Sequence, residues 1–289
     1  MSIEKYEKKK FSGAWTIIKE VALNSSVGWS FAWPAILANA LRSIVDATIF
    51  IFIATVVYAG SKFTWNGLSY PEYVFAGLFA SLMLNSSLTI PTGSLNFAYG
   101  MGELDVYQSL PYSVYPYVIG NLLYSYLVDS IYMISYLAIG EIVFGFSISP
   151  LTLLQALIVI LLGSLATLGL GLLTSISYFK VHVKNPEPLN WAINLLVSIL
   201  AGYYFPVSVL PLPLQYLSLI FPHTYVFEAT RLIIYGKASI FDLQKNITPL
   251  ILLTMILLPL GIYTYIKAVS YTHLRAHETE ADLVCRLLL

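Results

Sequence analysis

Six long apolar stretches with little polar sequence between them constrain this chain more than any other feature. They run over residues 31–59, 73–90, 114–144, 151–179, 189–210 and 247–267. An α-helix needs about 18–20 apolar residues to cross a hydrocarbon core of about 30 Å. Only 10% of all residues are charged, against about 25% in soluble domains. Strands of a membrane β-barrel would alternate apolar and polar residues, whereas residues 151–173 are apolar nearly throughout. The sequence therefore predicts an all-α membrane protein with six transmembrane helices.

Residues 269–289 differ in character from the rest of the chain. They hold two of the four histidines and the single cysteine. The string VSYTHLRAHET resembles the translation of a transposon sequencing adapter, so we interpret this segment as a non-native tail and exclude it from fold reasoning. Without the tail the chain has no cysteine, which removes disulfide, thiol and cysteine–metal chemistry.

The distribution of lysines predicts the orientation in the membrane. Five lysines precede residue 20, and further lysines follow the fourth and sixth stretches. The positive-inside rule places these segments in the cytoplasm and makes the chain a multi-pass protein of the cell membrane. Residues 12–24 form either an amphipathic interfacial helix or a frayed leader. We expect a cytoplasmic N-terminus at residues 1–28, a six-helix transmembrane domain at residues 29–268, and the tail.

Ionisable residues inside the predicted helices are costly and need partners. Arg42 and Asp46 are one turn apart and can pair as i, i+4 neighbours, for structure or for transport. Asp129 and Glu141 lie on the third stretch. We expect them to face a neighbouring helix or a water-filled path, and a proton relay would require partners at the same depth.

The loop between the second and third stretches carries the first functional signal. Residues 103–109 can form a short helix that ends before Pro111. Glu103 and Asp105 would lie in its first turn, where negative charge favours the helix dipole. Such a cytoplasmic helix, held against the membrane, offers a surface on which a partner protein could push.

The segment before the last stretch carries the second signal. Residues 202–236 are too apolar for a solvated loop, yet prolines at 206, 211, 213 and 222 prevent one continuous helix. We expect a broken, re-entrant hairpin at the outer leaflet, covered by protein or lining a cavity. Residues 227–235 can form a short helix with Glu228 and Arg231 as an i, i+3 pair. The hairpin could serve as an exit gate or as a structural lid.

Together these two loops resemble those of the permease subunit of type-2 ABC exporters. The first resemblance rests on Gly102, Glu103, Leu104, Pro111 and Gly120. The second rests on Gly202, Pro206, Leu210, Pro211, Pro222, Tyr225 and Arg231. One departure concerns residues 96–112, which carry only acidic charges, whereas the family usually has a more charged loop, often with arginine.

The resemblance implies an assembly of two permeases, identical or homologous, with two cytoplasmic ATPases. Residues 102–105 and Pro111 would couple to the ATPase, and substrate would leave past the outer hairpin. The chain has no G-x-x-x-x-G-K-[ST] phosphate loop, so ATP and Mg²⁺ are expected on the partner. We expect no catalytic residue, bound cofactor or nucleic-acid partner on this chain, and lipid around it.

Two other classes compete with this interpretation. A secondary, ion-coupled transporter would fit the acidic residues of the predicted helices, but the halves show no inverted repeat. A lipid-modifying membrane enzyme would gather several acidic or histidine side chains near one face. His223, Glu228 and Asp242 have the wrong spacing for a helical metal motif, so no metal site is expected.

Overall fold

The computed structural model describes residues 13–21, 37, 41, 45, 48, 64–110, 113–144, 148–181 and 187–287. Apart from four isolated positions, the first predicted transmembrane stretch lies outside these residues, as do Arg42, Asp46 and Pro111. Within the described residues the elements are helices, and the sole β-type pairing is an isolated bridge between Trp65 and Leu68. The predicted all-α class is therefore confirmed for this part of the chain.

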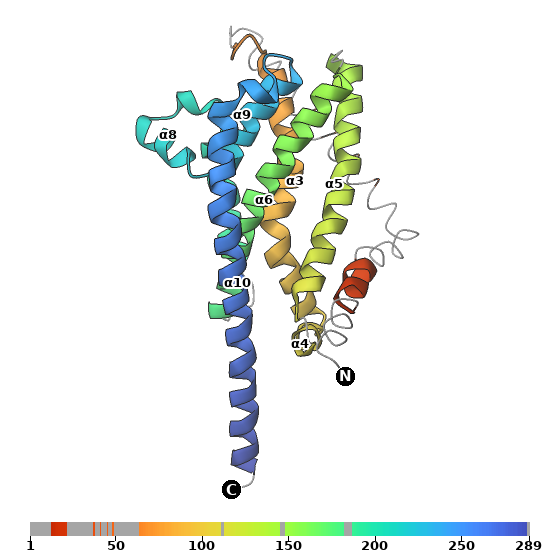
Figure 1. Ribbon diagram of the computed structural model, residues 1–289, viewed down its shortest axis with the longest axis vertical. Helices are drawn as coiled ribbons and strands as arrows, with labels where there is room; N and C mark the ends of the chain where they lie inside the picture. The colour runs from red at the N-terminus through yellow and green to blue at the C-terminus, as the bar shows by residue number, and fades with distance from the viewer. Residues whose placement is uncertain are drawn as a thin grey trace.

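Four of the described helices are long and apolar enough to cross a membrane. They are α3 (Tyr70–Gly100), α5 (Tyr115–Phe144), α6 (Pro150–Val181) and α10 (Gln244–Leu287). Helices α3, α6 and α10 run in one direction along the long axis of the bundle, and α5 runs in the opposite direction (Figure 1). They coincide with four of the predicted stretches, while the total of six remains a prediction.

Helix α3 extends further than its apolar pattern predicts, passing through Pro91 and ending at Gly100. Proline removes the hydrogen bond to the carbonyl four residues earlier, which here belongs to Ser87. Helix α6 approaches at this point, because a Cβ added to Gly171 would lie 2.5 Å from that Ser87 oxygen. The missing side chain lets the two backbones meet where α3 is weakest.

The fifth predicted stretch is not one continuous helix. Helix α7 (Glu187–Leu200) ends ten residues before that stretch does, and it is too short to cross the membrane alone. Gly202 follows with a φ of +77°, a left-handed conformation that glycine adopts without strain. The Tyr73 hydroxyl of α3 donates a hydrogen bond of 2.8 Å to the Gly202 carbonyl and fixes this turn.

Short helices then replace the loop, as the prolines predict. They are η1 (Val207–Val209), α8 (Leu212–Ser218) and α9 (Pro222–Ile234), followed by η2 (Ile240–Asp242). Pro206 and Pro211 cap the first two, and Pro222 opens α9. Proline suits the first turn of a helix because no backbone N–H is needed there. The segment is broken as expected, and its re-entrant depth remains a prediction.

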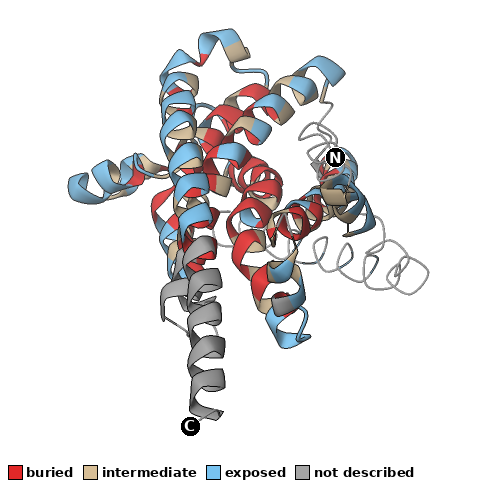
Figure 2. Cartoon of the chain, turned by 60° about the horizontal axis from the view of Figure 1, so that its bottom comes forward, coloured by how far each residue is buried: buried red, intermediate tan, exposed pale blue. Residues whose placement is uncertain are grey.

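Buried residues concentrate where α3, α6 and α9 meet (Figure 2). Close contacts at glycines hold this centre together. Gly163 of α6 faces Val226 of α9, and Gly169 of α6 meets Gly261 of α10 backbone to backbone. Small residues permit such approaches in membrane bundles, where packing drives helix association.

The two ends of the bundle carry different elements (Figure 1). Helix α4 (Leu104–Ser109) and the helix at residues 13–21 lie at one end, while α9 lies at the other. Beyond residue 268, α10 continues as a helix to Leu287 and extends away from the other helices (Figure 1). The non-native origin of residues 269–289 remains a prediction.

Candidate functional site

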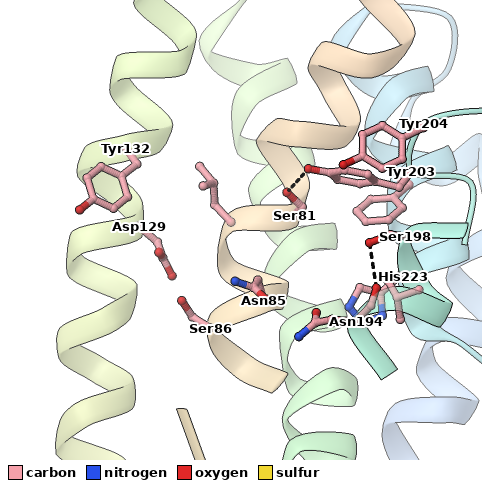
Figure 3. Close-up of a pocket in the computed structure, with 13 residues that line it drawn as sticks. Ser81, Asn85, Ser86, Asp129, Tyr132, Asn194, Ser198, Tyr203, Tyr204 and His223 are labelled. Carbon is pink, nitrogen blue, oxygen red and sulfur yellow. Dashed lines mark hydrogen bonds between the residues drawn. The ribbon is translucent and has the colours of Figure 1, made fainter. Parts of the chain in front are cut away.

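A polar cavity of about 500 Å³ lies between α3, α5, α7, the turn after α7, and α9. Ligand pockets in proteins have volumes of about 300–1,000 Å³. Its side chains come from both the transmembrane and the broken segments (Figure 3). They are Ser81, Leu82, Asn85, Ser86, Asp129, Tyr132, Asn194, Val197, Ser198, Tyr203, Tyr204, His223 and Phe227.

Helix α3 supplies one polar wall near its middle. Ser81 and Asn85 are one helical turn apart, and Ser86 follows directly. The Ser81 hydroxyl donates to the Leu78 carbonyl at 2.8 Å and lies 3.3 Å from the Tyr203 hydroxyl. The second contact joins α3 to the turn that follows α7, so the cavity wall and the turn are positioned together.

Asp129 of α5 is the acidic residue of the cavity. Its side chain is 7% exposed, and its Oδ2 atom has no hydrogen-bond partner among the described residues. Figure 3 shows its carboxylate and the Ser86 hydroxyl pointing toward one another. Ser125 of α5 donates to that same hydroxyl at 2.8 Å. The expectation that Asp129 faces a neighbour or a polar path is confirmed, whereas Glu141 is exposed.

His223 lies in the first turn of α9, on the wall opposite α5 (Figure 3). It is 3% exposed, and its Nδ1 atom has no hydrogen-bond partner among the described residues. Burial lowers the pKa of His223 to about 3, so the imidazole is neutral at physiological pH. The Phe227 ring packs edge-on against it, with 5.9 Å between ring centroids.

Arg231 holds α9 against α3 beside this cavity. Its guanidinium donates to the Tyr73 carbonyl at 2.8 Å and to the Tyr203 carbonyl at 2.9 Å. It also lies 3.6 Å from the centroid of the Tyr73 ring, which is a cation–π contact. Gly77 leaves the space, because a Cβ there would lie 2.6 Å from a guanidinium nitrogen. Arg231 takes its partners from these carbonyls, whereas Glu228 is exposed.

The other residues predicted for the outer gate surround these contacts. Gly202 makes the turn fixed by Tyr73, and Pro206 and Pro222 are buried. Pro211 is exposed before α8, and Tyr225 donates to the Leu219 carbonyl at 3.0 Å. Gly202 and Arg231 thus both contact Tyr73 and adjoin Tyr203 of the cavity wall, and the gating role of the set remains a prediction.

The predicted coupling residues lie at the far end of α3. Gly102, with a φ of +71°, ends α3 through a Schellman motif, in which the Glu103 N–H bonds the Ala98 carbonyl. Helix α4 follows from Leu104 to Ser109, as predicted, with Glu103 as its exposed N-cap residue. Leu104 is buried, whereas Val106 is 61% exposed.

Both elements at this end contact the beginning of α5. Tyr107 of α4 stacks on Tyr117 with 4.4 Å between ring centroids. A Cβ on Gly120 would lie 2.7 Å from the Cβ of Val21, so the helix at residues 13–21 rests directly on α5. The predicted N-terminal helix is therefore confirmed over these residues, and its neighbour is a transmembrane helix.

The sequence model of the ABC-2 type transporter family matches residues 38–235. The chain belongs to this family. The match covers both predicted signal loops and every helix from α3 to α9. A search of curated proteins found no match. Domains of this family form the membrane-spanning part of ABC transporters and pair with an ATPase subunit, so the chain is a multi-pass ABC transporter permease.

The sequence indicates Asp129 and the region of Gly202 and Arg231, but not the cavity, which Asp129 lines and the other two residues adjoin. Most of its other polar members are common serines, asparagines and tyrosines on four separate segments. The one local pattern that could indicate the cavity is the group of Ser81, Asn85 and Ser86 inside an otherwise apolar helix.

Proposed function

We propose that this permease exports its substrate, with energy from ATP bound and hydrolysed, with Mg²⁺, on two copies of a separate cytoplasmic ATPase. The observation that carries the proposal is the placement of α4. It is a short helix that follows the turn at Gly102, with Leu104 buried and Val106 exposed at one end of the bundle. Family membership supports the ATPase partner, and the lysine distribution supports a cytoplasmic location for this end.

In this proposal α5 transmits the movement. ATP-driven closure of the ATPases displaces α4 and the helix at residues 13–21, which both rest on the first turns of α5. Asp129 lies on the same helix, nine residues beyond Gly120, which corresponds to about 14 Å along its axis. A push at the cytoplasmic end therefore reaches the cavity through one continuous helix.

The outer side is formed by the η1–α9 segment, past which the substrate leaves. Two permeases, identical or homologous, complete the pathway within the lipid of the cell membrane. The direction of transport rests on the resemblance of the Gly202–Arg231 region to type-2 exporters. The polar lining of the cavity supports its use as a substrate site on the way out.

A photo-cross-linking experiment tests this proposal. Cys285 is first replaced by serine, and cysteine is introduced at Val106 of α4 or, as the matched control, at Val209 of η1. Val209 is 68% exposed but lies on the segment at the opposite end. Each variant is labelled with benzophenone maleimide and purified with the ATPase that accompanies it.

The expected result is an ATP-sensitive adduct with the ATPase from position 106 and none from position 209. Inside-out vesicles holding both subunits should take up substrate only with ATP. Equal adducts from both positions, or uptake driven by a proton gradient without the ATPase, would refute the proposal and favour a secondary carrier.

A further inference from the structure

We propose that the cavity between α3, α5, α7 and α9 binds an organic amine in its cationic form, with Asp129 as the counter-ion. The proposal names a substrate class for the site and rests on the proposed transport function. It follows from the charge, the hydrogen-bonding state and the aromatic content of the cavity wall.

Among the described residues that line the cavity, the charged side chains are of one sign. Asp129 is its single acidic member, and neither lysine nor arginine is among the lining residues. The guanidinium of Arg231, the nearest buried cation described above, is directed instead to the Tyr73 and Tyr203 carbonyls. An anionic ligand would find a carboxylate and no fixed positive charge, whereas a cationic ligand would find its complement.

Asp129 also has an unused acceptor. Its side chain is more than nine-tenths buried, and Oδ2 has no partner among the described residues. Ser86 can serve the other oxygen of this carboxylate. A buried carboxylate oxygen without a donor costs free energy, and a charge-assisted hydrogen bond from an ammonium group offsets that cost. Because this oxygen belongs to a side chain that lines the cavity, a bound ligand can supply the missing donor.

The opposite wall suits the rest of an amine-bearing molecule. Tyr203 and Tyr204 present aromatic rings across the cavity from α5 (Figure 3), and Phe227 of α9 also lines the cavity. Such rings stack on aryl groups and attract cations. His223 does not repel a cation, because burial lowers the pKa of its imidazole to about 3 and keeps it neutral. The geometry favours an aryl-alkyl amine, its nitrogen beside α5 and its aryl group beside the tyrosines.

Equilibrium binding of a matched pair of probes to the purified full-length chain tests this inference. Propranolol carries an aryl group, a hydroxyl and a secondary amine that is cationic at pH 7. N-acetylpropranolol has nearly the same shape but a neutral amide. Saturable binding is measured for the wild type, Asp129→Asn, and Glu141→Gln, which removes an exposed carboxylate from the same helix.

We expect the wild type to bind propranolol at least about tenfold more tightly than the neutral analogue, the size of one charge-assisted bond. Asp129→Asn should lose this preference, whereas Glu141→Gln should keep it. If Asp129→Asn elutes as an aggregate in size-exclusion chromatography, Asp129→Glu, which retains the charge, takes its place and should keep the preference. A wild type that binds neither probe saturably, or both equally, overturns the inference, as does an unchanged preference in a monodisperse Asp129→Asn.

The test separates this inference from the proposed function, because binding requires neither ATP nor the ATPase. Charge-selective binding without ATP-dependent uptake would retain the cation site and refute the exporter. ATP-dependent export with no charge selectivity at Asp129 would retain the exporter and refute the cation site.

Discussion

Replacing Arg231 with methionine should destabilise the fold strongly, although methionine is apolar and fills a similar volume. The guanidinium is 2% exposed and joins three segments through its two carbonyl partners and the Tyr73 ring. Methionine can make none of these polar contacts, and it leaves the Tyr203 carbonyl without its donor in a buried place.

The size of the effect follows from three contributions. Two hydrogen bonds from a charged donor are worth about 3–6 kcal/mol together, and a desolvated cation–π contact adds about 2 kcal/mol. Against this, burial lowers the pKa of Arg231 from 12.5 to about 10, which corresponds to a penalty of about 3 kcal/mol that methionine avoids. The net loss in the free energy of unfolding is about 2–5 kcal/mol, in the range measured when one partner of a buried ionic contact is removed.

Denaturant unfolding in detergent micelles measures this difference. Tryptophan fluorescence is a suitable signal, since Trp65 packs on Tyr73 with 5.3 Å between ring centroids. Arg231→Lys should be intermediate, because an ammonium cannot reproduce the planar fork of the guanidinium. Glu228→Gln, exposed on the same helix, should change the free energy of unfolding by less than about 0.5 kcal/mol. A methionine variant as stable as the wild type would contradict this prediction. The desolvation cost of the guanidinium would then equal the energy of its hydrogen bonds and its cation–π contact.

Two further predictions concern His223 and the α3–α6 contact. The folded-state pKa of His223 is about 3, below the ordinary value near 6.5, so on acidification the unfolded state binds the proton first and stability falls below pH 6.5. Between pH 7 and pH 5 the free energy of unfolding of the wild type should therefore fall by about 2 kcal/mol more than that of His223→Gln, with unfolding measured at both pH values. An equal fall in the two proteins would contradict this prediction. Gly171→Ala places a methyl group 2.5 Å from the Ser87 oxygen and should destabilise by about 1–3 kcal/mol. Gly93→Ala, with nothing within 4 Å of the new Cβ, should be neutral or stabilising by up to about 1 kcal/mol in the same assay.

Hydropathy predicted the long helices because lipid imposes one requirement on every residue of a transmembrane segment. Hydropathy did not predict the positions where a single residue determines the backbone conformation. The apolar run of residues 189–210 contains a turn at Gly202 that only its φ and the Tyr73 hydroxyl explain. Pro91 suggests an end to α3, yet the helix continues through it to Gly100, with α6 packed closely at the Ser87 carbonyl.

The site was less predictable than the fold for a related reason. Arg231 and Glu228 have the spacing of an ion pair, but the local pattern cannot show that carbonyls of α3 and the turn after α7 are nearer. Asp129 was noticeable because charge is rare in apolar helices. The neutral polar side chains around it form a site only where five segments converge, and the sequence of any one segment does not show that convergence.

The contrast between two helix seams has a mechanical consequence. Helices α3, α6 and α10 meet backbone to backbone at Gly169, Gly171 and Gly261, so any sliding between them requires steric separation. The α3–α5 seam combines a close contact of Gly140 with the Phe75 ring and two hydroxyl pairs, Ser86 with Ser125 and Ser87 with Tyr126. Hydroxyls can change partners at little cost, so these pairs tolerate a small displacement of α5 along α3 better than the backbone contacts do. Because α3 and α5 both line the cavity, a displacement at this seam would change the width of the cavity directly.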